Sequence, residues 1–345
     1  MLRCNCLISL ALLIAGVFVP AAHAQEQQIA QLGECPLESG QRLLDCRLGY
    51  RTFGQLAPDK GNVIISPTAA YGVSALSAMT VGPGKLLDST KYFVIVMDSL
   101  SNSVSSSPSN SKQQPRMQFP RITIKDMVDV EHTFLVTKLH INHVKAVIGV
   151  SMGGMQTFQW MVSYPDFMDK AIPIVGSPRL APYDLLLWQT EIDATKGDPA
   201  WKGGDYDLDP SAPLAAKVSR LTLSTPADVN SKFSRDSVLV FPSGPRPAAF
   251  AFPDANDRIR QLEAMMSLDV SRAFGGSMER AAASVKAPVL VIVSRQDHTV
   301  TPQPALDFAA ALHAETIVLD SVCGHGAPFC EADLVSQRVN EFLGR

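Results

Sequence analysis

One serine of this 345-residue chain, Ser151, lies between two glycines in the string Gly149-Val-Ser151-Met-Gly153. This G-x-S-x-G pattern is typical of a nucleophilic serine held on a tight turn between a strand and a helix. An apolar run at residues 146–150 precedes the serine, and a helical pattern at residues 154–164 follows it. Ser151 is therefore the candidate nucleophile. The alternative is a glycine-rich packing turn with an inert serine.

A serine nucleophile needs a general base, and the base needs an acid that orients it. Asp297 follows an apolar run at residues 289–293, and His325 follows another at residues 315–319. Both stand at the carboxyl ends of expected strands, and the chain order serine, acid, histidine is the one that accompanies such a turn. We assign the base to His325 and the orienting acid to Asp297.

Three other residues compete for these roles. Asp320 is expected to end and cap a strand. His298 is next to Asp297 in the sequence, so it is badly placed to bridge the acid and the serine. His313 falls in a helical pattern, where a packed or solvated histidine is expected. We therefore keep His325 as the base and Asp297 as the orienting acid.

Attack by the serine creates an oxyanion, which two backbone N–H groups would stabilise. Met152, directly after the nucleophile, is expected to supply one of them. The other should come from the loop after residues 63–66, where Pro67 has no N–H to donate. We favour Ala69 for this second donor, with Thr68 next.

Short, unbroken apolar runs alternate with helical patterns along much of the chain. Unbroken runs are typical of strands in a parallel sheet that is covered on both faces. The alternation predicts an α/β protein with a mostly parallel, doubly wound sheet. The expected strands are residues 63–66, 92–97, 146–150, 171–175, 289–293 and 315–319, and the expected helices are residues 124–139, 154–164, 304–313 and 334–343.

Residues 178–274 interrupt this alternation with tryptophans, many prolines and a polar stretch. We interpret them as a mostly helical cap inserted into a core of residues 25–177 and 275–345, although a peripheral decoration is the alternative. Cap aromatic residues more often serve packing than recognition. The candidate substrate contacts are Thr68 and Tyr71 in the loop after the first expected strand, and Trp188 and Tyr206 in the cap.

The serine-rich tract at residues 99–111 has two interpretations. Its composition suits a linker. It also follows the end of an expected strand, where α/β sheets place their ligand loops.

The first 24 residues have the pattern of a secretory signal peptide. Arg3 gives a positive start, residues 7–19 are apolar, and Ala22-His-Ala24 offers a cleavage site before Gln25. The apolar run is shorter than the roughly 20 residues of a spanning helix, so a membrane anchor is the weaker interpretation. We expect an exported protein, periplasmic or secreted, with no membrane span after cleavage.

Two of the six cysteines lie in the expected signal segment, and the other four form two local pairs. In an exported chain these pairs, Cys35 with Cys46 and Cys323 with Cys330, predict disulfides, with four buried thiols as the alternative. A net charge of −3 without a basic run argues against a nucleic-acid partner. No histidine or cysteine cluster has convincing ligand spacing, so no metal or other cofactor is expected.

The chain resembles the homoserine transacetylase group of α/β hydrolases over most of its expected mature length. The resemblance implies the α/β-hydrolase fold with a helical cap, a catalytic triad at Ser151, Asp297 and His325, and a homodimer by family analogy. Four strings carry the resemblance, and the last of them lies in the cap: Phe119-Pro-x-x-Thr-Ile-Lys-Asp126-Met, Gly149-Val-Ser-Met-Gly-Gly-Met-Gln156, Tyr164-Pro-Asp166 and Asp198-Pro-Ala-Trp201-Lys-Gly-Gly-Asp205-Tyr206. The cap string has no evident catalytic role, so its presence is a good marker of kinship.

Two departures from the group's pattern bear on the substrate. Homoserine acetyltransferases typically have Gly-His-Asp at the histidine, with the aspartate meeting the substrate's ammonium, whereas here Gly326 follows His325. An ungapped alignment puts Ala216 where the group has an arginine for the substrate carboxylate, with Lys217 or Arg220 as substitutes in another register. A buried charge without its partner is costly, so the missing anchors argue against homoserine.

We therefore expect an exported serine hydrolase that cleaves small-molecule carboxylic esters through an acyl-serine intermediate. Acetyl-CoA is a cytoplasmic metabolite, and water is the most available acceptor outside the cytoplasm. The alternative is an acyl-CoA-dependent O-acyltransferase of the homoserine O-acetyltransferase type. A catalytically dead binding module is a third hypothesis, which the complete set of serine, acid and histidine makes weak.

Overall fold

The structure is a computed structural model, and it describes residues 26–210, 212–238 and 254–345. The expected signal peptide, residues 1–24, lies outside the described residues. Within the described ranges, no helix combines the length and the apolar character needed to cross a membrane.

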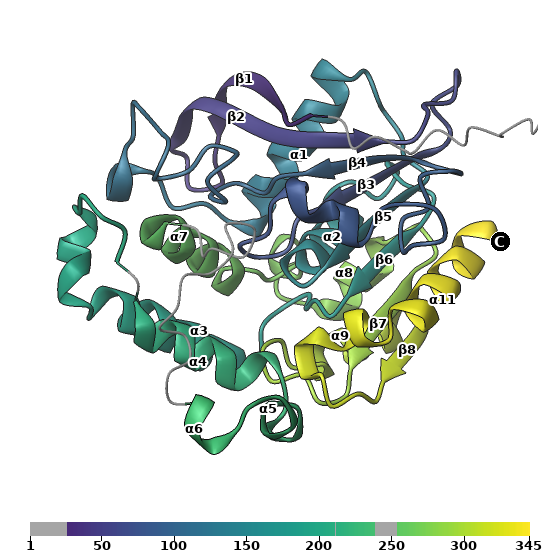
Figure 1. Ribbon diagram of the computed structural model, residues 1–345. Coiled ribbons are helices and arrows are strands. Elements are labelled where there is room, and N and C mark those ends of the chain that lie inside the picture. Colours follow the sequence, from purple (N-terminus) through teal and green to yellow (C-terminus); the bar gives the residue numbers. More distant parts are fainter. Residues whose placement is uncertain (1–25, 211, 239–253) are drawn as a thin grey trace, which may run out of the picture.

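Eight strands form a single sheet in the order β1-β2-β4-β3-β5-β6-β7-β8 (Figure 1). Strands β3 to β8 run parallel, whereas β2 is antiparallel to both of its neighbours. Strands β4 and β5 follow β3 in the chain and lie on opposite sides of it, so the strand order reverses at β3. Open α/β sheets bind their ligands at such a reversal. The strands are β1 (Gln28–Pro36), β2 (Arg42–Phe53), β3 (Val63–Pro67), β4 (Phe93–Met97), β5 (Ala146–Val150), β6 (Ala171–Ile174), β7 (Leu290–Ser294) and β8 (Glu315–Leu319).

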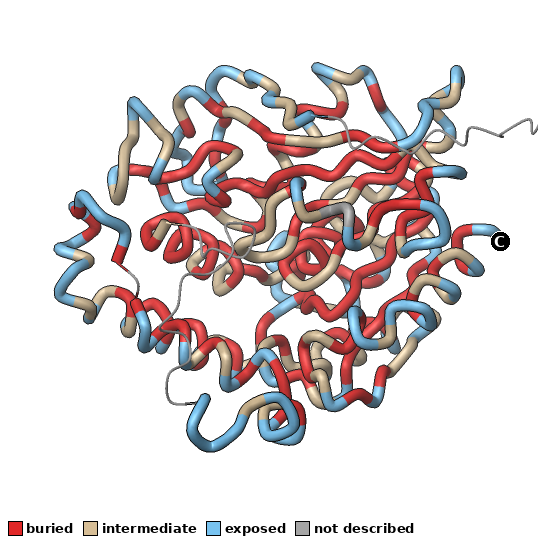
Figure 2. The backbone as a smooth tube through the Cα atoms, viewed as in Figure 1, coloured by how far each residue is buried: buried red, intermediate tan, exposed pale blue. Residues whose placement is uncertain are grey.

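Helices cover both faces of the sheet, and the central strands are buried between them (Figure 2). On one face Val147 of β5 belongs to a core cluster with Phe134, Phe158 and Phe308 from three helices. On the other face Ile148 belongs to a second cluster, which includes residues of the C-terminal helix. The helices are α1 (Ile124–Lys138), α2 (Met152–Ser163), α3 (Pro182–Lys196), α4 (Pro213–Leu223), α5 (Pro226–Lys232), α6 (Arg235–Val238), α7 (Ala255–Met266), α8 (Met278–Ser284), α9 (Gln303–Leu312), α10 (Ala327–Cys330) and α11 (Ala332–Gly344).

The α/β prediction is confirmed. The six predicted strands are β3 to β8, and the four predicted helices are α1, α2, α9 and α11, with ends that differ by at most two residues. The sequence analysis missed β1 and β2. Strand β1 lies at the edge of the sheet and exposes most of its residues, so it lacks the apolar run that identified the buried strands.

The chain between β6 and β7 is mainly helical in its described parts. Helix α3 packs against α4 and α7, and α3 to α6 lie together away from the sheet (Figure 1). The two ends of the insertion meet, because Val270 N–H donates to Pro178 O at 3.0 Å and Arg179 bridges Asp269. The exact division into core and cap stays a prediction, and residues 211 and 239–253 lie outside the described part.

The serine-rich tract is not a linker. Five of its eight serines are buried, namely Ser99, Ser101, Ser105, Ser106 and Ser107. The hydroxyls of Ser103 and Ser109 both donate to the carboxylate of Asp257 in the first turn of α7, each at 2.6 Å. Burial raises the pKa of Asp257 to about 7, and these hydroxyls oppose the rise. The tract therefore joins the end of β4 to a helix of the insertion.

Candidate active site

Ser151 occupies the turn between β5 and α2, with a backbone φ of 59° and ψ of −120°. A positive φ is uncommon outside glycine, and here the backbone N–H of Ser151 is fixed by Ile174 O at 2.8 Å. The flanking glycines have a steric cause. A Cβ on Gly149 would lie 2.1 Å from Gly153 O, and a Cβ on Gly153 would lie 2.4 Å from Pro67 O. Larger residues would push β5, α2 and the end of β3 apart.

The structure brings Ser151, His325 and Asp297 into one hydrogen-bonded chain. The Nε2 atom of His325 lies 2.8 Å from Ser151 Oγ, and its Nδ1 atom lies 2.6 Å from Asp297 Oδ2. The other oxygen of Asp297 accepts from the N–H groups of Thr299 and Val300, at 2.8 and 2.9 Å. A histidine whose Nδ1–H donates to a carboxylate keeps Nε2 free to accept the serine proton.

The three competing residues lie elsewhere in the structure. Asp320 is exposed and pairs with Arg295, with 3.7 Å between the charged atoms. His298 is also exposed. His313 stands one residue beyond the end of α9, as a left-handed cap with a φ of 53°. It was predicted inside the helix, and the left-handed turn at this position explains the earlier end.

The two candidate donors in the loop after β3 differ in their hydrogen bonds. Thr68 N–H donates to Met97 O at 3.0 Å, which extends the pairing of β3 with β4 and occupies that donor. Ala69 lines the same pocket as Ser151. Met152 is the first residue of α2, and N–H groups in the first turn of a helix have no acceptor within it. This arrangement favours Ala69 over Thr68 as the partner of Met152.

A pocket of about 240 Å³ opens at Ser151 and His325. Known ligand pockets are roughly 300–1,000 Å³, so this one suits a small substrate. The core, α3, α4 and α7 all contribute to its walls. The wall is mostly apolar and includes Val150, Trp188, Leu223, Leu262, Met265 and Phe329.

Two of the four predicted substrate contacts line this pocket, namely Tyr71 and Trp188. The other two, Thr68 and Tyr206, are not among the residues that line it. Thr68 is buried and donates its hydroxyl to Ser99 Oγ at 3.1 Å. The hydroxyl of Tyr206 accepts from the backbone N–H of Asn256 at 3.1 Å, so this ring packs at the start of α7.

Glu191 is a pocket residue that the sequence analysis missed. It lines the pocket with only 6% of its surface exposed. Burial raises the pKa of Glu191 from 4.5 to about 7, and the charge of Arg258 opposes the rise. Its position three residues after Trp188 on α3 is a signal that could have found it, because residues three apart share a face of a helix.

The pocket wall contains no lysine or arginine among the described residues. Ala216, at the position aligned with the group's arginine, is buried in α4 and does not line the pocket. Arg220 lies over the ring of Phe233, with 5.1 Å between the guanidinium carbon and the ring centre. It therefore does not take the role of carboxylate anchor in this arrangement.

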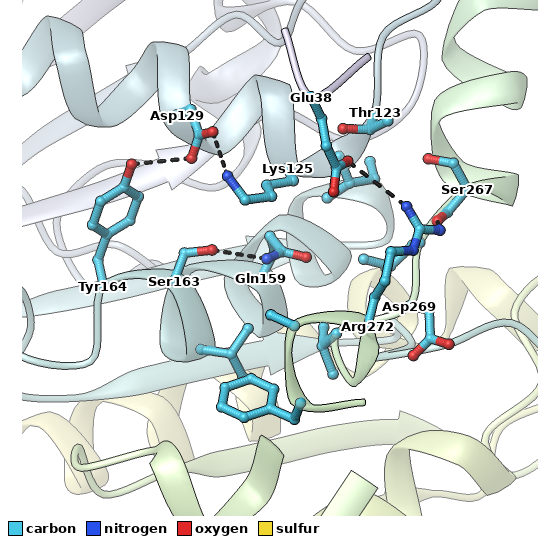
Figure 3. Close-up of a pocket in the computed structure, with 16 residues that line it drawn as sticks. Glu38, Thr123, Lys125, Asp129, Gln159, Ser163, Tyr164, Ser267, Asp269 and Arg272 are labelled. Carbon is cyan, nitrogen blue, oxygen red and sulfur yellow. Dashed lines mark hydrogen bonds and ion pairs between the residues drawn. The ribbon is translucent and has the colours of Figure 1, made fainter. Parts of the chain in front are cut away.

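A larger cavity of about 380 Å³ lies away from the serine, between α1, α2 and the segment after α7 (Figure 3). Its charged groups pair with one another. Lys125 Nζ lies 2.6 Å from Asp129, which also accepts from the hydroxyl of Tyr164, and Arg272 faces Glu38 at 3.8 Å. The smaller pocket holds the reactive groups, so we assign the candidate site to it despite its size.

Both predicted cysteine pairs lie at disulfide distance. Cys35 joins Cys46 with 5.8 Å between the Cα atoms, and Cys323 joins Cys330 with 6.6 Å. The second bridge closes the loop that carries His325. In the described part of the chain, no group of three or more His, Cys, Asp or Glu side chains could hold a metal ion.

Comparisons with known proteins agree with this fold. Residues 78–331 match the alpha/beta hydrolase fold family. An ethyl acetate hydrolase of Pseudomonas veronii is 32% identical, covering 86% of this chain and 88% of its own. A homoserine O-acetyltransferase of Methanosalsum zhilinae is 29% identical, covering 90% of this chain and 71% of its own. The solved structure of the acetyl esterase MekB is similar with a TM-score of 0.86 and 29% identity, covering 93% of this chain and 97% of that one.

The relatives thus include both esterases and acetyltransferases, as the resemblance implied, and they support an enzyme. The profile match spans most of the chain, and the fold has the parallel sheet, the serine turn and the helical insertion that were expected. This chain belongs to the alpha/beta hydrolase fold family.

Proposed function

We propose that the chain is an exported serine hydrolase that cleaves carboxylic esters of small acyl groups. The observation that carries the proposal is the hydrogen-bonded chain from Ser151 Oγ through His325 to Asp297, at the end of a small apolar pocket. Such a chain activates a serine hydroxyl for attack on a carbonyl carbon. The names of the esterase relatives support the same reaction.

In the proposed mechanism, Ser151 Oγ attacks the ester carbonyl while His325 Nε2 accepts its proton. Asp297 holds the Nδ1–H and stabilises the imidazolium, and its own position is fixed by two backbone N–H groups. The N–H groups of Met152 and Ala69 stabilise the oxyanion. His325 then gives its proton to the departing alkoxide. A water, deprotonated by His325, attacks the acyl-serine, and His325 returns this proton to Ser151 Oγ as the bond to the acyl group breaks and the acid leaves.

The pocket wall supports a neutral ester over an amino acid as the substrate. Homoserine carries a carboxylate, which needs a basic partner in a dry site. The described wall offers Glu191 instead, and a carboxylate would repel that group of the substrate. Gly326 likewise leaves the position after His325 without the aspartate that would meet an ammonium. Both features favour water as the second acceptor.

Transfer to an alcohol is the second candidate function, because several relatives are homoserine O-acetyltransferases. Incubation with acetyl-CoA and homoserine, followed by mass spectrometry, separates the two. O-acetylhomoserine formed faster than free acetate would establish the transferase and overturn the hydrolase.

The direct test uses residues 25–345 with aryl esters of short acids, beside Ser151→Ala and His325→Ala. We expect hydrolysis by the wild type and a loss of at least 10³-fold in kcat in each variant. Equal activity in wild type and Ser151→Ala, or none in either on any chain length, would overturn the proposed function.

Export is the remaining part of the proposal. It is supported by the signal-peptide pattern of residues 1–24 and by two cysteine pairs at disulfide distance, since disulfides persist outside the reducing cytoplasm. N-terminal sequencing of the protein recovered outside the cytoplasm should begin at Gln25. Recovery of an uncleaved chain in the cytoplasm would contradict export.

A further inference from the structure

A second cavity of about 240 Å³ adjoins the Ser151 pocket. It lies between the segment after the short helix at residues 74–79 and the α10–α11 region. Two residues, Val150 and Phe329, line both cavities, and Val150 directly precedes the nucleophile. The cavities therefore meet beside Ser151. The apolar wall of the second cavity consists of Met79, Leu86, Val150, Pro328, Phe329 and Val335.

Phe329 is an exposed aromatic side chain that lines both cavities. It belongs to α10, within the loop closed by Cys323 and Cys330, so its backbone is constrained. Its side chain is not part of the core, because 53% of the residue surface is exposed. Met79 is exposed to a similar extent. An apolar ring that lines two apolar hollows, next to a reactive serine, suits contact with a substrate rather than packing.

The chemistry of an ester requires room on two sides. The acyl group and the alcohol group diverge from the carbonyl carbon that Ser151 attacks, and the Ser151 pocket alone is below the usual size of a ligand site. The second cavity has an apolar floor, and its charged residues, Lys85 and Asp333, are exposed at the rim. The second cavity therefore fits an alkyl or aryl group of the substrate. Among the described residues that line it, no buried charged side chain could pair with a charged substrate group.

We propose that the second cavity is a subsite for one of the two hydrocarbon groups of the ester, and that Phe329 is the partition that sets the accepted chain length. The inference rests on the proposed ester hydrolysis. Because Phe329 lines both hollows, a smaller side chain would join them into one continuous apolar channel that starts at Ser151.

The experiment compares wild type with Phe329→Ala on two ester series. One series lengthens the acyl chain from acetate to octanoate with 4-nitrophenol fixed, and the other lengthens the alcohol from ethyl to octyl with acetate fixed. We expect the ratio of kcat/KM for the longest to the shortest ester to rise at least tenfold in one series, mainly through KM. Each further buried CH₂ is worth roughly fourfold in binding.

Two further variants decide whether the second cavity is the cause. Ala332→Phe places a ring into this cavity from the exposed first residue of α11, so it should cancel the gain of Phe329→Ala in the double variant. Leu334→Ala is the matched control, because Leu334 is exposed on the same helix and lines neither cavity. It should leave the ratio unchanged.

A ratio that stays constant in both series, or a gain that survives Ala332→Phe, would overturn the inference while Ser151-dependent hydrolysis still stands. Absence of any Ser151-dependent hydrolysis in the wild type would overturn the proposed function, and the subsite with it. The two failures are thus distinguished by the wild-type enzyme alone.

Discussion

The carboxylate of Asp184, in the first turn of α3, accepts hydrogen bonds from both the backbone N–H and the hydroxyl of Thr301, at 3.1 and 3.0 Å. Thr301 lies four residues after Asp297, so a fully buried side chain of the insertion holds the loop that carries the candidate acid. Burial raises the pKa of Asp184, its hydrogen bonds with Thr301 oppose the rise, and the charge of Asp297 adds to it. Helix α3 and the acid loop are therefore coupled.

Replacement of Asp184 by Ala should weaken both stability and turnover. The change leaves two donors of the half-buried Thr301 without their acceptor, which costs about 1–3 kcal/mol in the free energy of unfolding. Because Asp184 acts through Asp297, kcat on a short ester should fall about 10- to 100-fold with a smaller change in KM. Asp193→Ala, at an exposed position of the same helix, is the control. A kcat equal to that of the control would contradict a positioning role.

The two disulfides should differ in their effect on activity. Removal of either short cross-link, by Cys→Ser at both positions, should lower the free energy of unfolding by about 2–3 kcal/mol. Cys323→Ser with Cys330→Ser should also lower kcat, because that loop carries His325. Cys35→Ser with Cys46→Ser should spare kcat, because that bridge joins β1 to β2 at the edge of the sheet. Chemical denaturation and initial rates measure both effects, and equal loss of kcat in the two variants would count against the assignment.

Glu131 should make stability depend on pH. It is fully buried in α1 and accepts from Trp160 Nε1 at 2.9 Å, and its other oxygen has no hydrogen-bond partner among the described residues. Burial raises the pKa of Glu131 from 4.5 to about 8, and the Trp160 bond opposes the rise. The folded protein holds this proton more tightly than the unfolded chain does. The stabilising contribution is thus fully present below pH 4.5 and is lost as pH rises through about 8.

Glu131→Gln should remove this dependence and keep the bond from Trp160. The free energy of unfolding of the wild type should fall by up to about 4 kcal/mol between pH 5 and 9 relative to the variant. Urea denaturation across this range tests it, with Glu341→Gln at an exposed position as the control. Parallel pH profiles for wild type and Glu131→Gln would refute the prediction.

Glu191 should make the enzyme discriminate against anionic esters as pH rises. Its pKa of about 7 means that the pocket gains a negative charge between pH 6 and 8, next to Tyr71 and Arg258 and across from His325. The KM for a half-ester of a dicarboxylic acid, which keeps one free carboxylate, should rise several-fold over this range, relative to the KM for a neutral ester of the same length. In Glu191→Gln the ratio of the two KM values should stay constant. A ratio that changes equally in both proteins would exclude Glu191 as its source.

The sequence predicts the parts of the site that depend on local rules. Ser151 follows from a five-residue pattern, and Asp297 and His325 follow from the rule that parallel strands end at one edge of a sheet. The parts that depend on how the insertion packs were missed. Glu191 of the insertion lines the same pocket as Ser151, far away in the sequence, and no local pattern encodes that approach. The same holds for Phe329 of α10 in the core.

Trp188 and Tyr206 are both aromatic residues of the insertion, and the sequence could not rank them. Trp188 lies on α3 where this helix faces the pocket, whereas Tyr206 is held at the start of α7 by Asn256. Strand β1 was missed because it lies at the edge of the sheet and exposes most of its residues, so it lacks a continuous apolar signal. Strand β2 lies inside the sheet, but charged and polar residues interrupt its apolar positions.

The link between Asp257 and the serine-rich tract restricts how the insertion can move. Helix α7 is fastened to the core by three hydrogen bonds to Asp257, by Arg260 to Phe119 O and by Gln261 to Leu100 O. A hinged opening of the whole insertion would break these bonds together, at about 1 kcal/mol or more for each. Helix α7 thus acts as a fixed wall of the pocket, and substrate has to enter without displacing it.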